Sequence, residues 1–79
     1  MPATIHSAEH AKLIGLLRRL RENAGLRQVD LALRLDRPQS FVSKYEAGER
    51  RVDLIELRAI CNALGVELRT VVREWERLI

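Results

Sequence analysis

Residues 27–46 constrain the fold of this 79-residue chain more than any other stretch. Apolar side chains recur there with helical spacing in two short runs, at about 28–35 and about 38–46. Between the runs, Asp36 tolerates the left-handed backbone of a sharp turn, and Pro38 suits the first turn of a helix, where its missing N–H is not needed. The segment therefore predicts two short helices joined by a tight corner. The polar side of the second helix is formed by Gln39, Ser40, Ser43 and Lys44.

Three further helices are predicted around this pair, and no segment alternates as a strand would. Their expected ranges are about 8–23, 53–64 and about 67–78. Ser7 is the expected N-cap of the first and Gly25 its stop, while Asp53 and Glu56 form a capping box and Gly65 ends the helix that follows them. We therefore expect an all-α fold of five helices. The side chains expected to face its core are Leu13, Leu17, Leu20, Ala24, Leu31, Ala32, Leu35, Val42, Tyr45, Leu54, Leu57, Ile60, Cys61 and Leu64, with Phe41 at the border.

The positive charge of the chain coincides with the two-helix unit. The length is that of one small domain, so residues 1–79 are expected to form a single unit, with 1–6 as a flexible N-terminus. The formal net charge is +3; residues 27–51 hold six basic and four acidic side chains, whereas 52–79 hold four and five. Twelve of the 14 basic residues are arginine, which binds phosphate groups and guanine edges better than lysine does.

The sequence carries no sign of export or of a membrane span. Cys61 is the single cysteine, so an intramolecular disulfide is impossible and a reducing compartment is favoured. No apolar run reaches 18 residues, and the N-terminus lacks the basic start and long apolar stretch of a signal peptide. We therefore expect a cytoplasmic protein without a membrane partner.

No catalytic or metal-binding set is recognisable in the sequence. His6 and His10 are spaced four residues apart, but two histidines without further ligands nearby rarely hold a metal. No serine-histidine-aspartate arrangement, paired carboxylates or glycine-rich phosphate loop is present. The chain is therefore expected not to be an enzyme, and to use no metal, cofactor or small-molecule effector.

A set of positions spread over about residues 17–72 has the residue types and spacing of a known family. These positions are Leu20, Arg21, Gly25, Leu26, Gln28, Leu31, Ala32, Leu35, Gln39, Ser40, Val42, Ser43, Glu46, Gly48, Leu54, Leu57, Ala63, Leu64, Gly65 and Val66. Through them the chain resembles the helix-turn-helix domains of the lambda repressor and Cro class, also called the XRE family. The resemblance implies a lambda-repressor-like DNA-binding domain whose second and third helices form the helix-turn-helix. It also implies that the third helix lies in the major groove of double-stranded DNA while the second crosses above it.

Carried over by position, the resemblance implies a role for each of ten side chains. The expected base and groove contacts are Gln39, Ser40, Ser43 and Lys44. The expected phosphate contacts are Arg27, Gln28, Arg50 and Arg51. A structural ion pair between Arg21 and Glu46 is expected to orient the third helix. Arg27 stands where the family often has a serine or threonine cap, and it is expected to contact phosphate directly.

The last predicted helix has more apolar side chains than one face of a small bundle can hide. A contiguous apolar patch usually marks an interface, so a homodimer contact is predicted. Its residues are Val71, Val72, Trp75, Leu78 and Ile79. A twofold dimer would place two reading helices one DNA turn apart, ~34 Å, on a pseudo-palindrome.

The leading hypothesis is a homodimeric, sequence-specific transcription regulator that acts as a repressor, and two alternatives stay open. One is an antitoxin or restriction-modification controller of the same fold, the former with a toxin partner. The other is a protein-interaction module that has lost DNA binding. Val29, Leu33 and Ile55 favour the module, since they are apolar where the family is usually polar. We expect the N-terminal segment, through Ile5, or a partner to cover Val29 and Leu33.

Overall fold

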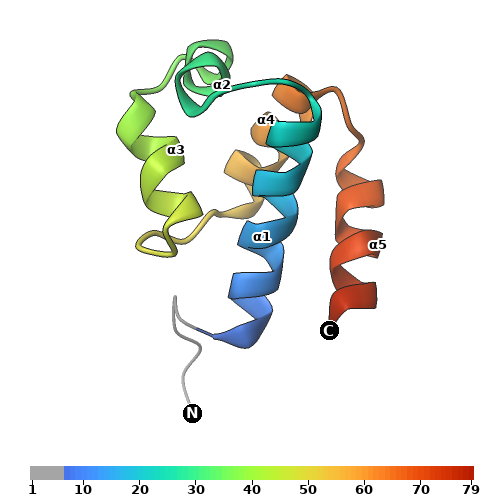
Figure 1. The fold of residues 1–79 in the computed structure, drawn as a ribbon. Helices are drawn as coiled ribbons and strands as arrows, with labels where there is room; N and C mark the ends of the chain where they lie inside the picture. The colour runs from blue at the N-terminus through green and yellow to red at the C-terminus, as the bar shows by residue number, and fades with distance from the viewer. Residues whose placement is uncertain (1–6) are drawn as a thin grey trace.

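The computed structural model describes residues 7–79, and it folds them into five helices without a strand in that range. The helices are α1 (Ala8–Asn23), α2 (Gln28–Leu35), α3 (Gln39–Glu46), α4 (Leu54–Leu64) and α5 (Leu68–Leu78). The long α1 stands in the centre, with α3 packed on one side and α5 on the other (Figure 1). The predicted all-α fold of five helices is confirmed. The predicted flexible N-terminus, with Ile5 and His6, lies outside the described residues.

The helix ends follow the predicted capping chemistry. The Ser7 hydroxyl accepts a hydrogen bond from the His10 N–H at 3.1 Å. Asp53 and Glu56 form the reciprocal capping box, with N–H to carboxylate distances of 2.7 and 3.0 Å. Three predicted starts need correction by one residue, because Pro38, Asp53 and Glu67 have extended backbones and act as N-caps of α3, α4 and α5.

Asp36 makes the corner between α2 and α3 by taking the left-handed conformation, with φ +54°. Its N–H donates to the Leu33 carbonyl at 3.2 Å, and the Arg37 N–H donates to the Ala32 carbonyl at 3.0 Å. These two bonds form a Schellman motif, which satisfies the last carbonyls of α2. The corner therefore forms with an aspartate where a glycine would be the easier residue.

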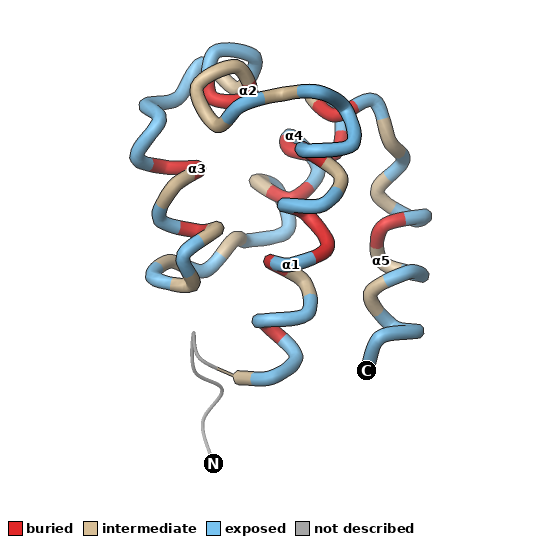
Figure 2. Tube along the Cα trace, in the orientation of Figure 1, coloured by how far each residue is buried: buried red, intermediate tan, exposed pale blue. Residues whose placement is uncertain are grey.

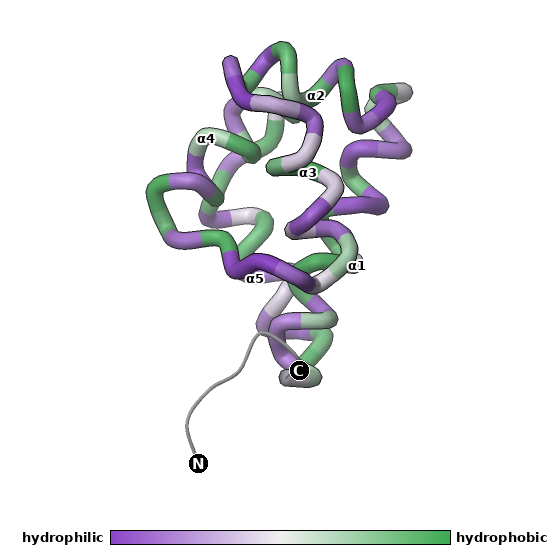
Figure 3. Tube along the Cα trace, turned by 90° about the vertical axis from the view of Figure 1, so that its left-hand side faces the viewer, coloured by the Kyte–Doolittle hydropathy of each residue, from purple (hydrophilic) through white to green (hydrophobic). Residues whose placement is uncertain are grey.

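The core lies between α1, α2, α3 and α4, and Val71 of α5 completes it (Figure 2). Its completely buried side chains are Leu17, Leu31, Val42, Tyr45, Ile60 and Cys61. The predicted core position is wrong for two residues: Leu54 is 65% exposed and Ala24 is exposed, because Leu54 is the first residue of α4 and Ala24 is the C-cap that follows α1. Phe41, predicted at the border, is buried, and Ile14 and Leu16 join the core unpredicted. Apolar and polar segments alternate along each helix, as amphipathic packing requires (Figure 3).

Helix α5 packs its apolar stripe against α1 and α4. Val71 is buried within the domain, so its assignment to a dimer interface is wrong. Trp75 is half-buried, and its indole N–H donates to the Glu9 carbonyl at 2.9 Å. Exposure rises towards the end of the helix, to 39% at Leu78 and 55% at Ile79. Only the last turn of α5 thus offers an open apolar surface.

Of the two apolar residues expected to be covered, Leu33 is 75% exposed and Val29 is half-buried. Ile55, the third apolar residue at a usually polar position, is 78% exposed. Among residues 7–79, no helix is both long and apolar enough to cross a membrane.

Candidate nucleic-acid interface

Helix α3 separates its side chains into a core face and an outward polar face. Phe41, Val42 and Tyr45 are buried. Gln39, Ser40 and Lys44 are exposed and Ser43 is half-buried. The four side chains predicted to read DNA therefore lie on one outward surface of a helix whose other side is anchored in the core. Such a helix can present hydrogen-bonding groups to a major groove without unfolding.

Arg21 and Glu46 form a buried ion pair that fixes the end of α3 to α1. The Arg21 Nε and Nη2 groups donate to the two Glu46 carboxylate oxygens at 2.7 and 3.0 Å. The remaining Arg21 nitrogen, Nη1, donates to the Leu26 carbonyl at 2.7 Å. Only 9% and 3% of the two side chains is exposed, and hydrogen bonding to Glu46 raises the pKa of Arg21. This two-point contact specifies both distance and orientation.

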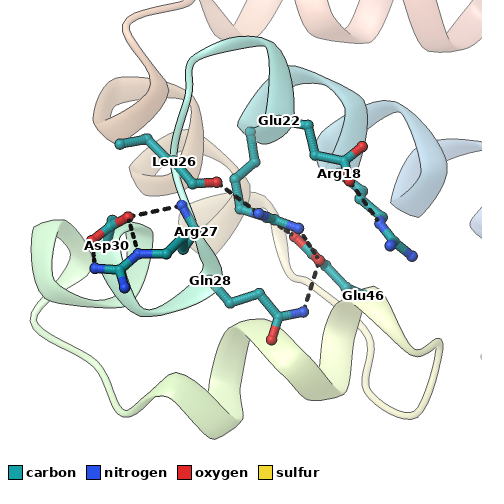
Figure 4. A network of polar contacts seen from close by, with 8 residues as sticks. Arg18, Glu22, Leu26, Arg27, Gln28, Asp30 and Glu46 are labelled. Atoms are coloured by element: carbon teal, nitrogen blue, oxygen red, sulfur yellow. Dashed lines mark hydrogen bonds and ion pairs between the residues drawn. The ribbon is translucent and has the colours of Figure 1, made fainter.

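Gln28 joins the same network from the first turn of α2. Its Nε2 donates to a Glu46 oxygen at 3.0 Å, and Figure 4 shows its amide turned towards that carboxylate. A glutamine amide has two N–H donors and one carbonyl. One donor therefore holds α2 against the end of α3, and the other donor is left for a further acceptor.

Arg27 is tied to its own helix. Its backbone N–H donates to Asp30 at 2.9 Å, and its Nε and Nη2 groups donate to the same carboxylate at 3.0 Å each. The Arg27 guanidinium lowers the pKa of Asp30 to about 2. Because 78% of the Arg27 side chain is exposed, it lies at the surface beside Gln28, at the positive end of the α2 dipole.

The two loop arginines that follow α3 have different surroundings. Arg50 donates through Nη1 and Nη2 to the two oxygens of Glu56 at 2.9 and 2.7 Å. Arg51 is exposed, and no side-chain hydrogen bond or ion pair is formed by it within residues 7–79. The family resemblance implied a phosphate contact for both arginines. The Arg50–Glu56 contact was missed because a separation of six residues across a loop matches no helical spacing.

Comparison with known proteins identifies the family. A family model described as a helix-turn-helix domain matches residues 13–75. An XRE-family like protein from Pseudomonas syringae pv. tomato is 43% identical, with 94% of this chain and 90% of that chain covered and a TM-score of 0.87. The chain belongs to the XRE-type helix-turn-helix family. It is thus a helix-turn-helix DNA-binding regulator of XRE type, in which α2 and α3 form the helix-turn-helix.

Other solved structures of XRE-type fold are also similar. The restriction-modification controller protein C.AhdI from Aeromonas hydrophila is 34% identical, with 82% of this chain and 98% of that chain covered and a TM-score of 0.76. The clp gene regulator ClgR from Corynebacterium glutamicum is 26% identical, with 89% and 90% covered and a TM-score of 0.79. None of the curated protein sequences matches this chain.

Proposed function

We propose that this XRE-type protein is a cytoplasmic repressor that binds a pseudo-palindromic operator in double-stranded DNA as a homodimer. The observation that carries the proposal is the outward polar face of α3, held at its end by Arg21, Glu46 and Gln28. A helix fixed in this way can read base edges, because its direct contacts need a defined angle to the groove. Catalysis has no part in this function.

Each exposed group has a proposed role. The Gln39 amide pairs with the N6 and N7 groups of an adenine, and Ser40, Ser43 and Lys44 contact neighbouring base edges or the groove wall. The second amide N–H of Gln28 donates to a backbone phosphate, where the N-terminus of α2 also favours an anion. Arg51, and Arg27 through the Nη1 group that Asp30 does not bind on its 78%-exposed side chain, supply further phosphate contacts, which give affinity without sequence choice.

Selection of bound duplexes from a random DNA library, followed by footprinting, tests the proposal as a whole. A palindromic consensus with half-sites one helical turn apart, ~34 Å, is expected from a twofold dimer. A library that yields no enriched sequence would contradict DNA recognition and favour the interaction module instead. Exposed Leu33 and Ile55 would then be its first candidate contacts.

Gln39→Ala is expected to weaken binding to the selected operator by ~1–3 kcal/mol and to relax discrimination at one base pair. The cause is the loss of one bidentate contact, while the phosphate contacts remain. Titration of the variant on the operator, on single-base variants of it and on random duplex measures both effects. Glu49→Ala, which changes an exposed side chain in the loop after α3, serves as control. An equal loss on operator and random duplex would show that Gln39 does not read a base.

The proposed dimer contact is centred on the last turn of α5, where Leu78 and Ile79 are exposed. Ile79→Lys is expected to shift the protein to monomer in sedimentation at micromolar concentration, because two like charges would face each other across a twofold axis. Operator affinity should fall with it. Thr70→Lys adds the same charge nine residues earlier, on the opposite side of the helix, and should sediment as the wild type does. A dimeric Ile79→Lys variant would refute the α5 contact.

A restriction-modification controller is the second candidate function. The specific support is the 34% identity to C.AhdI over 82% of this chain. Both candidates share the DNA contacts proposed for α3, and they differ in the genes controlled. A restriction enzyme or methylase gene adjacent to the operator would favour the controller.

A further inference from the structure

One carboxylate, that of Glu56 in the first turn of α4, contacts arginines at both ends of α3. Arg50, just after α3, donates to its two oxygens at 2.9 and 2.7 Å. Arg37, in the corner just before α3, has its Nη1 at 3.6 Å from Glu56 Oε2. The Glu56 side chain is 14% exposed, and hydrogen bonding from Arg50 lowers its pKa to about 2. The carboxylate is therefore ionised throughout the neutral pH range.

The two arginines also enclose a core residue of α3. The guanidinium carbons of Arg37 and Arg50 lie 4.0 and 4.8 Å from the centroid of the Phe41 ring, within the range of cation–π attraction. Phe41 in turn packs edge-on against Tyr45, with ring centroids 5.4 Å apart. A shift of Glu56 would thus be transmitted through both guanidiniums to the buried face of α3. We name Arg37, Phe41, Arg50 and Glu56 the α3 clip.

Because of the α3 clip, Arg50 and Arg51 differ in how many of their guanidinium nitrogens already have an acceptor. Arg50 donates through Nη1 and Nη2 to Glu56, and its Nη1 also donates to the Arg51 carbonyl at 2.7 Å. A phosphate would have to compete with a two-point ion pair for the same nitrogens. The Arg51 guanidinium has no such competitor within residues 7–79.

We propose that Glu56 is a positioning residue for DNA recognition: through Arg50, Arg37 and Phe41 it sets the angle of α3, and it withholds Arg50 from phosphate, which Arg51 binds instead. The proposal rests on the proposed DNA-binding function and replaces the phosphate role predicted for Arg50. Under this proposal Arg50 affects which DNA sequence is chosen, and Arg51 affects how strongly binding depends on salt.

Glu56→Gln tests the clip while it preserves the capping box, because glutamine at this position can still accept the Asp53 N–H. Glu49→Gln is the matched control: it removes the same charge from an exposed side chain in the loop between α3 and α4. Binding to the selected operator and to random duplex is measured between 50 and 200 mM salt. Circular dichroism and thermal unfolding establish that each variant is folded.

The expected result for Glu56→Gln is a roughly tenfold smaller ratio of operator to random-duplex affinity. The slope of log affinity against log salt concentration should also be steeper by about 0.9 for each phosphate newly bound by a freed arginine. Glu49→Gln is expected to leave the ratio unchanged. A general loss of fold would lower affinity without steepening the salt dependence, so the slope distinguishes positioning from simple destabilisation.

The paired variants Arg50→Gln and Arg51→Gln give an answer even where Glu56→Gln does not fold. Arg50→Gln should lower the ratio of operator to random-duplex affinity with little change in the slope of log affinity against log salt concentration. Arg51→Gln should reduce that slope by about 0.9 and leave the affinity ratio unchanged. Equal slope reductions by both variants, or a Glu56→Gln ratio equal to that of Glu49→Gln, would overturn the proposal. Wild-type protein that binds no duplex would instead refute the proposed function.

Discussion

Glu46→Ala is expected to lower the free energy of unfolding by about 3–5 kcal/mol, because it leaves the buried Arg21 guanidinium without its carboxylate. Two Arg21 nitrogens and the Gln28 amide lose their acceptor at once. A small domain has a total stability of only about 5–15 kcal/mol, so a large unfolded fraction should appear. Urea unfolding followed by circular dichroism at neutral pH measures the loss.

Two variants show whether the unpaired charge is the cause. Glu22→Ala, at the residue that follows Arg21 in α1, removes a carboxylate that is 54% exposed and pairs with Arg18 at 3.5 Å; its effect should stay within about 0.5 kcal/mol. Arg21→Met combined with Glu46→Leu removes both charges and should be less destabilised than Glu46→Ala alone. If the double variant were the less stable protein, apolar packing and not the ion pair would dominate at this site.

Leu31→Ala is expected to lower the free energy of unfolding by about 2–5 kcal/mol, through lost apolar burial and the cavity left behind. Leu31 is completely buried, and it lies on α2, which packs against both α3 and α4. Loss of its side chain should therefore loosen the helix-turn-helix as well as the domain. Thermal and urea unfolding measure the stability, and operator titration below the unfolding transition measures the effect on recognition.

Leu33→Ala provides the control on the same helix with the same chemical change. Leu33 is 75% exposed, so its truncation creates no cavity and should change stability by no more than about 0.5 kcal/mol. Equal losses for the two variants would mean that Leu33 is buried in solution, either by a second copy or by another partner. Dilution would identify the former, since a contact between copies weakens as concentration falls.

The helix-turn-helix could be predicted from the sequence because its signals are local. The spans of α1 and α2 follow from apolar spacing and, for α1, from the Ser7 cap. The Asp53–Glu56 box likewise marks the start of α4. Asp36 marks the corner because few residues other than glycine accept its backbone conformation. Errors fell at helix ends, where Leu54 has apolar character but no neighbour to pack against.

The chemistry of the candidate site was predicted only in part, because the partner of a long side chain depends on which helices approach each other. Arg50 donates to Glu56 whereas Arg51 does not, and Gln28 donates to Glu46, because the packing of the helices brings these side chains together.

The sequence by itself determined five helices, a tight corner at Asp36 and a polar face on α3, since each depends on residues within a few positions of one another. Only the tertiary structure decided that Val71 belongs to the core and not to a dimer contact. It likewise decided that Glu56 gathers Arg37 and Arg50 around Phe41. The physical reason is that ion pairs and burial depend on distance in space, which the packing of α1, α4 and α5 sets.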